Sequence, residues 1–350
     1  MKLLFGPYIK ENPYQKQLTD NLKNLGIQVK DIQESFFKQS LSGSWKPDVL
    51  HLHWLHAFFL ADNYLLAIIK LTIFAIKIAI LRLTGVRIIW TAHNINNHER
   101  KYLLLDRFCT YYVSYIADAV IVHSQAAKNK LIKKININNK QKISVVPHGN
   151  YLEYYQNDVD KETVKKQLNL TESNFVFLLI GAIRPYKGVI ELIENFQNLN
   201  DENSRLIIAG NPINQEFASL IQSKIKSDSA IKFIPGYIPE AQMQVYLNAC
   251  DAVVFPYQDI LTSGSVLLAM SFQKPCVVPR IGCIGEILDN RGAFLYDPDN
   301  KNGLFQALTD SIKHKDRLSE MGKYNLELAS QYSWQDIANK TFNIYQLTLK

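Results

Sequence analysis

The chain has few cysteines, only four among 350 residues. They are Cys109, Cys250, Cys276 and Cys283, without CxxC spacing and without a cluster of neighbouring histidines. This pattern argues against a disulfide-stapled secreted module and against a zinc site, and it is typical of a reduced, cytoplasmic protein. We also expect no signal peptide, because the apolar run at the N-terminus is too short for one.

Two common nucleotide-binding signatures are missing as well. No GxGxxG pattern follows the first strand-like run, and no Walker A loop occurs. Their absence argues against a dehydrogenase or an ATPase. The net charge of +7 favours an anionic partner such as a phosphate or a phospholipid headgroup. Because the basic residues lack interleaved aromatic side chains, we predict no nucleic-acid partner.

Long apolar runs are also scarce, and the main one, residues 64–83, predicts a helix. Three basic residues interrupt it: Lys70, Lys77 and Arg82. Each costs up to about 2.5–3.5 kcal/mol in a bilayer, so we reject a transmembrane span. Polar residues recur every seven positions, at 63, 70, 77 and 84, which makes one narrow polar stripe. The helix is either packed into a core or lies on a membrane surface with its lysines toward anionic headgroups.

Strand-like runs alternate with helix-like segments along the chain. The runs are at residues 3–5, 27–29, 49–54, 87–93, 118–124 and 142–149, and then at 174–182, 205–212, 231–237, 251–257, 274–279 and 292–297. Apolar strands separated by helices indicate parallel sheets covered on both faces. One internal echo, ADAVIVHS at 117–124 and CDAVVFPY at 250–257, supports two halves. We predict an α/β protein of two doubly wound domains, residues 1–160 and 161–332, and a last helix from Ser333.

The strongest chemical signal is GAIRPYKG at 181–188. It lies between a buried strand and a helix, so Arg184 and Lys187 stand at the carboxyl end of a strand, where open α/β sheets bind ligands. Two cations beside a helix N-terminus suit a diphosphate. The alternative is a solvated basic loop.

A second signal is TSGS, formed by Thr262, Ser263, Gly264 and Ser265. It also follows a strand and leads into a helix. Small hydroxyl residues around a glycine offer N–H and O–H donors to phosphate oxygens. Alternatively, Thr262 or Ser263 is a plain helix N-cap.

Histidines gather at predicted strand ends of the first half. His93 and Asn94 end one strand, and Glu99 follows in the same loop. This arrangement favours hydroxyl recognition and general-base chemistry, with a structural histidine as the alternative. His148, in VVPHGN, either lines a cleft or caps a strand. A metal site at His51 and His53 is disfavoured, because the nearest carboxylate falls on the opposite strand face.

These segments resemble the group 1, family 4-like glycosyltransferases of the GT-B fold. GAIRPYKG, FIPGYIPEAQMQVYLNACDAVVFPY, TSGSVLLAMSFQKPCVVP and GEILDNRGAFLYDPDN are similar to the nucleotide-sugar half. DVLHLHW, TAHN, ADAVIVHS and VVPHGN are similar to the acceptor half of bacterial exopolysaccharide enzymes. The resemblance covers almost the whole chain. It implies two Rossmann-like domains facing across a cleft, with residues 333–350 crossing back to the N-terminal domain.

The resemblance also implies site residues. It assigns the donor diphosphate to Arg184, Lys187 and the amides of residues 262–265, and the base to Tyr237 and Ile238. It implies no metal and no cofactor beyond the nucleotide-diphosphate sugar itself. His93 takes the position of a cleft histidine near the transferred sugar.

Two family features are missing. Family 4 enzymes usually carry two glutamates eight residues apart, and the aligned positions here are Ile260 and Leu268. The second normally holds the ribose, and the first tends to accompany retention of anomeric configuration. The glycine-rich first loop is replaced by FGPYIKENPYQ, in which Asn12 and Tyr14 are candidate cleft contacts. These changes indicate a divergent branch, either an inverting enzyme with Glu99 or His93 as base or an inactive relative.

We therefore predict a cytoplasmic glycosyltransferase, which the membrane-surface alternative for residues 64–83 would place at the inner face of the plasma membrane. It would move a hexose from a nucleotide-diphosphate sugar to a lipid-linked or oligosaccharide acceptor in exopolysaccharide or envelope synthesis. The alternatives are a nucleotide-sugar epimerase of the same fold and a non-catalytic nucleotide-sugar or membrane-binding relative. The residues do not distinguish GDP from UDP.

Overall fold

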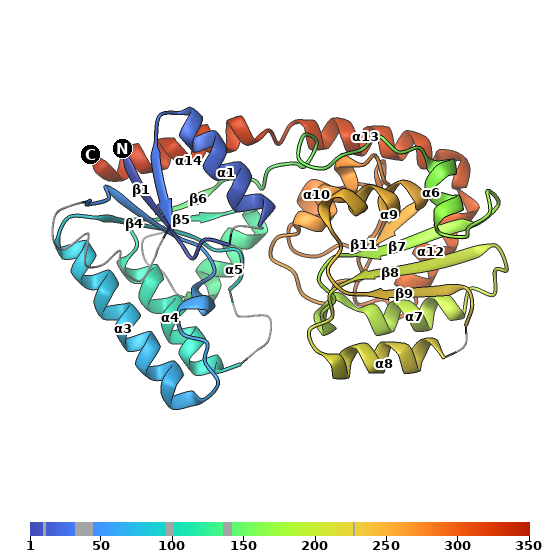
Figure 1. Ribbon diagram of the computed structural model, residues 1–350, viewed down its shortest axis with the longest axis horizontal. Coiled ribbons are helices and arrows are strands. Elements are labelled where there is room, and N and C mark those ends of the chain that lie inside the picture. The colour runs from blue at the N-terminus through green and yellow to red at the C-terminus, as the bar shows by residue number, and fades with distance from the viewer. Residues whose placement is uncertain (10–11, 32–44, 96–100, 136–141, 227) are drawn as a thin grey trace. The chain divides into compact units, whose positions relative to one another are not determined.

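The computed structural model describes residues 1–9, 12–31, 45–95, 101–135, 142–226 and 228–350. They form two compact units, Met1–Gly149 with Tyr332–Lys350 and Asn150–Gln331 (Figure 1). In the described residues each unit is built around one parallel six-stranded sheet with helices between the strands. The predicted fold class is therefore confirmed.

The first unit has the strand order β2-β1-β3-β4-β5-β6. Its strands are β1 (Lys2–Gly6), β2 (Gln28–Asp31), β3 (Val49–Leu52), β4 (Arg87–Thr91), β5 (Ala119–Val122) and β6 (Ile143–Val145). Its helices are α1 (Pro13–Asn24), η1 (Leu55–Phe58), α3 (Tyr64–Leu83), α4 (Leu103–Ile116), α5 (Gln125–Ile135) and α14 (Trp334–Leu349). The order reverses between β1 and β3, and ligands of open α/β sheets bind beyond the carboxyl ends of the strands at such a point.

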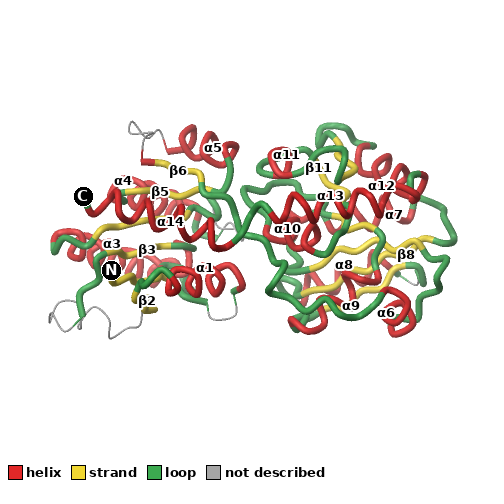
Figure 2. The backbone as a smooth tube through the Cα atoms, turned by 90° about the horizontal axis from the view of Figure 1, so that it is seen from above, coloured by secondary structure: helices red, strands yellow, loops and turns green. Residues whose placement is uncertain are grey.

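The helices of the first unit cover both faces of its sheet. On one face α1 lies beside α14, and on the other α3, α4 and α5 follow one another (Figures 1 and 2). Trp334, Ile337 and Tyr345 bury the inner side of α14 against Leu3, Phe5 and their neighbours. The last helix thus belongs to the core of this unit.

The second unit has the strand order β12-β11-β10-β7-β8-β9. Its strands are β7 (Phe175–Ile180), β8 (Ser204–Gly210), β9 (Ile231–Pro235), β10 (Ala252–Val254), β11 (Cys276–Pro279) and β12 (Ala293–Tyr296). Its helices are α6 (Lys161–Gln167), η3 (Pro185–Lys187), α7 (Val189–Gln197), α8 (Gln215–Ile225), η4 (Glu240–Gln242), α9 (Met243–Ala249), α10 (Gly264–Ser271), α11 (Ile284–Ile287), α12 (Gly303–Lys313), η5 (Lys315–Arg317) and α13 (Leu318–Ser330). Here the order reverses between β7 and β10.

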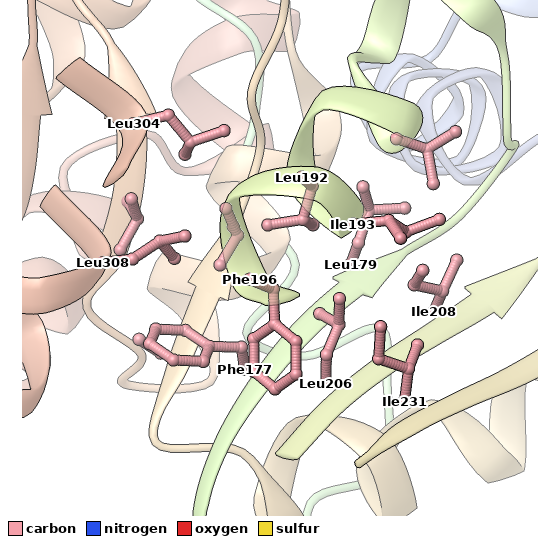
Figure 3. Close-up of a cluster of buried hydrophobic side chains, with 14 of the residues drawn as sticks. Phe177, Leu179, Leu192, Ile193, Phe196, Leu206, Ile208, Ile231, Leu304 and Leu308 are labelled. Atoms are coloured by element: carbon pink, nitrogen blue, oxygen red, sulfur yellow. The ribbon is translucent and has the colours of Figure 1, made fainter. Parts of the chain in front are cut away.

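The second core lies largely between this sheet and helices α7, α8 and α12. Phe177 and Leu179 project from β7 toward Leu192, Ile193 and Phe196 of α7 (Figure 3). These α7 positions follow helical spacing, so one apolar face is buried. That packing holds the segment between β7 and α7, which carries the predicted cations.

The units divide at different residues from those predicted. The first division falls after Gly149 rather than after residue 160. Asn150 Nδ2 donates to the Ala329 carbonyl at 2.9 Å, and the Tyr151 N–H donates to Ser271 Oγ at 3.1 Å. Residues 150–160 therefore belong to the second unit, because tertiary hydrogen bonds hold a segment whose polar composition looks like a linker.

The two echoing segments serve the same structural purpose. Asp118 and Asp251 each precede a strand and each clamp the start of the neighbouring strand. The Asp118 carboxylate accepts from the Ile88 N–H at 2.8 Å, and the Asp251 carboxylate accepts from the Val176 N–H at 2.8 Å. Each aspartate also donates its own N–H to the carbonyl of that same residue. The two similar segments thus make the same pair of hydrogen bonds, which fix the register between neighbouring parallel strands.

We expect Asp251→Ala to destabilise the second unit by about 1.5–3 kcal/mol, because the N–H of buried Val176 loses a charged acceptor. Chemical unfolding followed by circular dichroism measures the change. Glu162→Ala, which removes only the exposed pair with Lys166, is the matched control, and it should cost less than about 0.5 kcal/mol. Equal losses in the two variants would contradict the clamp.

Candidate donor and acceptor sites

The two predicted donor segments follow the two strands that flank the switch point of the second sheet. GAIRPYKG leaves β7, and the TSGS segment follows β10. Gly188 has a φ of +70°, and a Cβ there would lie 2.0 Å from the Pro256 carbonyl oxygen. Only glycine lets the turn before α7 approach the chain leaving β10 so closely. The sequence therefore brings both segments to one edge of the sheet.

Lys187 is a buried cation at this edge. The residue is only 9 % exposed. Burial lowers the pKa of its ammonium to about 8, and the nearby positive charge of Arg184 contributes to the same shift. Within the described residues its ammonium makes no ion pair or hydrogen bond, and its near contact is the ring of Tyr257 at 5.8 Å. A buried charge normally has a partner, so this lysine is suited to an anionic ligand.

The Lys187 ammonium and the Ser265 hydroxyl both lie near the main chain at Gly181, which has no side chain. A Cβ at Gly181, whose φ is +112°, would lie 4.0 Å from Lys187 Nζ and 3.7 Å from Ser265 Oγ. Both groups thus face the main chain at the end of β7. A cation, a hydroxyl and glycine backbone together form a cradle that fits phosphate oxygens.

Arg184 is held by the main chain. Its Nη1 donates to the carbonyls of Ile183 at 3.0 Å and Asn211 at 2.9 Å. A guanidinium has five donors in a rigid fork, so these bonds fix its plane and leave further donors for an anion. The structure therefore brings Arg184, Lys187 and Ser265 to one edge of the unit.

The TSGS segment contains the helix N-cap that was the alternative to phosphate binding. Ser263 is the N-cap of α10, since its Oγ accepts from the Val266 N–H at 3.2 Å, and it also contacts the Tyr257 hydroxyl at 3.2 Å. Thr262 Oγ1 is buried and has no hydrogen-bond partner within the described part of the chain. Gly264 opens the helix, and its amide lies in the first turn. Tyr257 was not predicted, and its only sequence signal is its place after β10.

The nucleoside residues differ in exposure. Tyr237 is 65 % exposed and Ile238 is buried, directly after β9 and Gly236, whose φ is +135°. An exposed aromatic face next to a buried aliphatic is compatible with stacking on a base. Ile260 and Leu268, aligned with the missing glutamates, are both buried.

A hollow of about 780 Å³ in the second unit lies at the opposite edge of the sheet. Lys161, Asp251 and Lys274 are among its lining residues, near the amino ends of β7 and β10. Parallel sheets bind ligands at their carboxyl edge, so we do not assign this hollow to the donor.

The first unit gathers five imidazoles at the carboxyl edge of its sheet. They are His51 and His53 after or within β3, His93 after β4, His123 after β5 and His148 after β6, and all are buried. The ring of Tyr14 lies among them, with centroids 4.7 Å from His93, 5.0 Å from His148 and 5.3 Å from His123. The predicted residues Tyr14, His93 and His148 thus come together. His123 was not predicted, although it too directly follows a strand.

Three of these rings form an ordered chain of hydrogen bonds. The Val146 carbonyl only accepts, so His123 Nδ1 carries the proton that it donates there at 2.8 Å. In neutral rings, His123 Nε2 then accepts from His93 Nδ1 at 3.4 Å, and His93 Nε2 accepts from His53 Nδ1 at 3.0 Å. The Val146 carbonyl therefore fixes the tautomers of His123, His93 and His53.

This chain limits the predicted role of His93. Both ring nitrogens are engaged, and its face stacks on Trp54 with centroids 4.4 Å apart and planes 14° apart. Burial and the neighbouring imidazoles hold the pKa of His93 well below its usual value. The ring is therefore neutral at physiological pH, as a base must be, but it must release one hydrogen bond before it takes a proton from a substrate.

The other predicted residues have separate positions. Asn12 is the N-cap of α1 and accepts from the Gln15 N–H at 3.2 Å. Asn94 lines a small cavity of about 20 Å³ that is also lined by His53 and Asp106. Glu99 lies outside the described residues. In the part of the chain that the structure describes, no group of three or more His, Cys, Asp or Glu side chains could hold a metal ion.

Both halves match known family models. Residues 160–327 match the family described as "Glycosyl transferases group 1", and residues 31–153 match "Glycosyltransferase Family 4". Together the two matches extend over most of the chain.

Curated relatives agree with these matches. The chain is 26 % identical over 313 residues to a GDP-mannose:glycolipid 4-beta-D-mannosyltransferase of Xanthomonas campestris pv. campestris, covering 88 % of this chain and 82 % of the relative. It is 27 % identical over 210 residues to the lipopolysaccharide 1,2-N-acetylglucosaminetransferase of Salmonella typhimurium, covering 57 % and 55 %.

Solved structures share the architecture. Sucrose-phosphate synthase from Thermosynechococcus elongatus aligns with a TM-score of 0.77 at 16 % identity, over 99 % of this chain and 98 % of that one. Anabaena HepE in complex with UDP and glucose aligns with a TM-score of 0.76 at 18 % identity, over 98 % of each chain. At such identities the likeness establishes the fold.

Proposed function

Because this chain belongs to the group 1 glycosyltransferases of the GT-B fold, we propose that it transfers a hexose from a nucleotide-diphosphate sugar to a lipid-linked or oligosaccharide acceptor. Glycosyltransferase activity is the family's common chemistry. The donor, the acceptor and a place in exopolysaccharide or envelope synthesis are our proposal. The donor site is assigned from one observation: the buried ammonium of Lys187 lies near the Ser265 hydroxyl and the main chain at Gly181.

The donor we propose first is GDP-mannose, with a glycolipid as acceptor and a β-linked product. The support is the printed name of the Xanthomonas relative, whose match covers most of both chains. From an α-linked nucleotide sugar, a β-linked product means inversion of configuration. Inversion is compatible with Ile260 and Leu268 in place of the family's glutamates.

The chemistry proposed needs neither a metal nor a further cofactor. As the bond between the sugar and the diphosphate breaks, negative charge develops on the leaving diphosphate. Arg184 and Lys187 would stabilise that charge, and the hydrogen bonds that hold the Arg184 guanidinium mean that this group needs little reorganisation. His93 or Glu99 would take the proton of the acceptor hydroxyl, His93 after releasing one of its two ring hydrogen bonds.

Thermal-shift measurements against GDP, UDP and their sugars test the donor. We expect GDP and GDP-mannose to stabilise the protein by about 2.7 kcal/mol at a hundredfold excess over the dissociation constant. A preference for UDP would replace the nucleotide in the proposal, and no stabilisation by any nucleotide would contradict it. The anomeric proton coupling of the product, measured by NMR, tests inversion.

The buried Ile260 and Leu268 also favour a second candidate, a non-catalytic relative that binds nucleotide sugars. Donor binding without transfer or hydrolysis, across a panel of lipid-linked acceptors, would support that candidate. A nucleotide-sugar epimerase would instead convert the donor with no acceptor present, so product analysis separates all three.

We place the enzyme in the cytoplasm, at the inner face of the plasma membrane. Nucleotide sugars are cytoplasmic metabolites, and a lipid-linked acceptor lies in the bilayer. The four cysteines are free and buried, which suits a reducing compartment. Fractionation of cells that express the tagged protein would test this placement.

A further inference from the structure

Helix α3 buries only a narrow stripe. Ala67, Leu71, Phe74, Ile78 and Leu81 are buried, at the spacing of one helix face. The remaining aliphatic side chains include eight exposed ones: Leu65, Leu66, Ile68, Ile69, Ile73, Ile76, Ile80 and Leu83. By length and composition α3 could cross a membrane, yet 28 % of its most apolar window is buried in the unit. Neither a core helix nor a free span accounts for these exposures.

Helix α4 adds a second apolar stripe. Leu104, Phe108, Tyr111 and Tyr115 recur three or four residues apart, so they share one helix face, and all are exposed. Leu104 is 70 % exposed and Tyr115 75 %. Aromatic side chains with a polar tip are typical of the boundary between acyl chains and headgroups.

The two helices lie side by side (Figures 1 and 2). The Tyr112 hydroxyl of α4 donates to the Ala75 carbonyl of α3 at 2.8 Å, and Phe108 stacks on Tyr112 with centroids 6.1 Å apart. We call the exposed apolar side chains of both helices the α3–α4 surface. Exposed apolar patches of this extent mark interaction sites.

The exposed charges on these two helices are all positive. Helix α3 contains Lys70, Lys77 and Arg82 and no acidic residue, and α4 has exposed Arg107 beside a single, buried Asp106. An anionic partner complements such a surface. A second copy of this chain, related by a twofold axis, would place cation against cation.

Helix α3 is also held to its own unit. Arg82 pairs with Asp118 at 2.9 Å and donates to the Ile116 carbonyl, and Phe74 stacks on Phe58 with centroids 4.3 Å apart. These contacts keep the buried stripe against the sheet. The helix can therefore present its outer face to a bilayer without leaving the fold.

We propose that the α3–α4 surface docks flat on an anionic phospholipid bilayer, with the aliphatic and aromatic side chains in the interface and Lys70, Lys77 and Arg107 on the headgroups. The proposal extends the single predicted helix to a two-helix surface. It rests on the proposed function in one respect, since docking would bring the enzyme to a lipid-linked acceptor in the bilayer.

Co-sedimentation with vesicles tests the docking. We expect binding to phosphatidylglycerol–phosphatidylcholine vesicles and at least about tenfold weaker binding to phosphatidylcholine alone. The double variant Ile69→Glu with Phe108→Glu should lose binding at least about tenfold, since both carboxylates oppose insertion. Leu220→Glu, at an exposed leucine of α8 in the second unit, is the matched control and should bind as the parent does.

Other outcomes are equally decisive. Binding that is absent in the parent, or unchanged in the double variant, would overturn the proposal. So would light scattering that shows a parent dimer and a variant monomer, since the surface would then join two copies. The thermal midpoint of the double variant should match the parent, because both substituted side chains are exposed. Donor binding by thermal shift is read separately, so docking without donor binding would refute only the proposed function.

Discussion

Replacing Arg184 and Lys187 together by alanine should abolish sugar transfer while leaving the fold intact. Each cation would contribute a charge-assisted contact to the diphosphate, worth about 1.5–3 kcal/mol, so the pair predicts a loss of about 10²- to 10⁴-fold in kcat/KM. Initial rates with saturating acceptor measure the loss. Full activity in the double variant would sink the assignment of the donor site.

A matched double variant distinguishes the loss of two charges at the donor site from the loss of two positive charges elsewhere on the protein. Lys313→Ala with Arg317→Ala removes the same two charges from exposed positions at the end of α12 and in η5, and it should leave the rates unchanged. The pH dependence supplies a second check. Lys187 has a pKa of about 8 without donor, and a bound diphosphate raises it. Donor affinity should therefore be full below that pH, fall above it by up to about tenfold per pH unit, and lose this dependence in Lys187→Ala.

The first unit should unfold near pH 5 while the second unit stays folded. Burial lowers the pKa of His51 to about 3, of His148 to about 3 and of His123 to about 4, and it holds those of His53 and His93 well below their usual range. The unfolded chain takes up protons below pH ~6.5, while the folded unit does not. Stability is therefore full above that pH and is lost as the pH falls toward the folded-state values.

The expected size of this effect is large. At pH 5 the buried neutral imidazoles of His51, His123 and His148 each cost about 2 kcal/mol, so these three cost about 6 kcal/mol, comparable with the whole stability of a domain. All four tryptophans, residues 45, 54, 90 and 334, lie in the first unit, so their fluorescence reports its unfolding alone. Far-ultraviolet circular dichroism should retain the signal of the second unit. Tryptophan emission that stays native down to about pH 4 would contradict the prediction.

His314 offers a control for the acid transition. It is exposed and lies in the second unit, directly after α12. Replacing it with glutamine should leave the tryptophan transition unmoved, since this side chain lies outside the unit whose unfolding the tryptophans report. A shift equal to that of a buried-histidine variant would show that the burial of the rings is not the cause.

The donor edge shows how much a sequence can predict. The conformation of GAIRPYKG follows from its local sequence. Gly181 and Gly188 have positive φ angles, and the residues after Gly188 have helical periodicity. Its place between a strand and a helix was therefore predictable from local pattern. The burial of Lys187 was not, since it depends on Tyr257 and Ser265 arriving from another strand.

The histidine cluster shows the opposite case. The five imidazoles come from four strands, two of them from β3, and only parallel pairing in the order β3-β4-β5-β6 brings the strand ends to one edge. Local pattern pointed to His93 and His148 but passed over His123, whose segment looked like a strand alone. The hydrogen-bond direction from His53 through His93 to Val146 depends on atoms brought together by three crossovers.

The sequence by itself determined the few cysteines, the twelve strand-like runs, the cations of the RPYK turn and the apolar character of residues 64–83. These are local properties, because period, composition and glycine placement act within a turn or a strand. The tertiary structure alone decided which charge is buried, which nitrogen donates and which face of α3 meets solvent. Those properties depend on neighbours far apart in the chain, and burial and hydrogen bonding exist only after the sheets have formed.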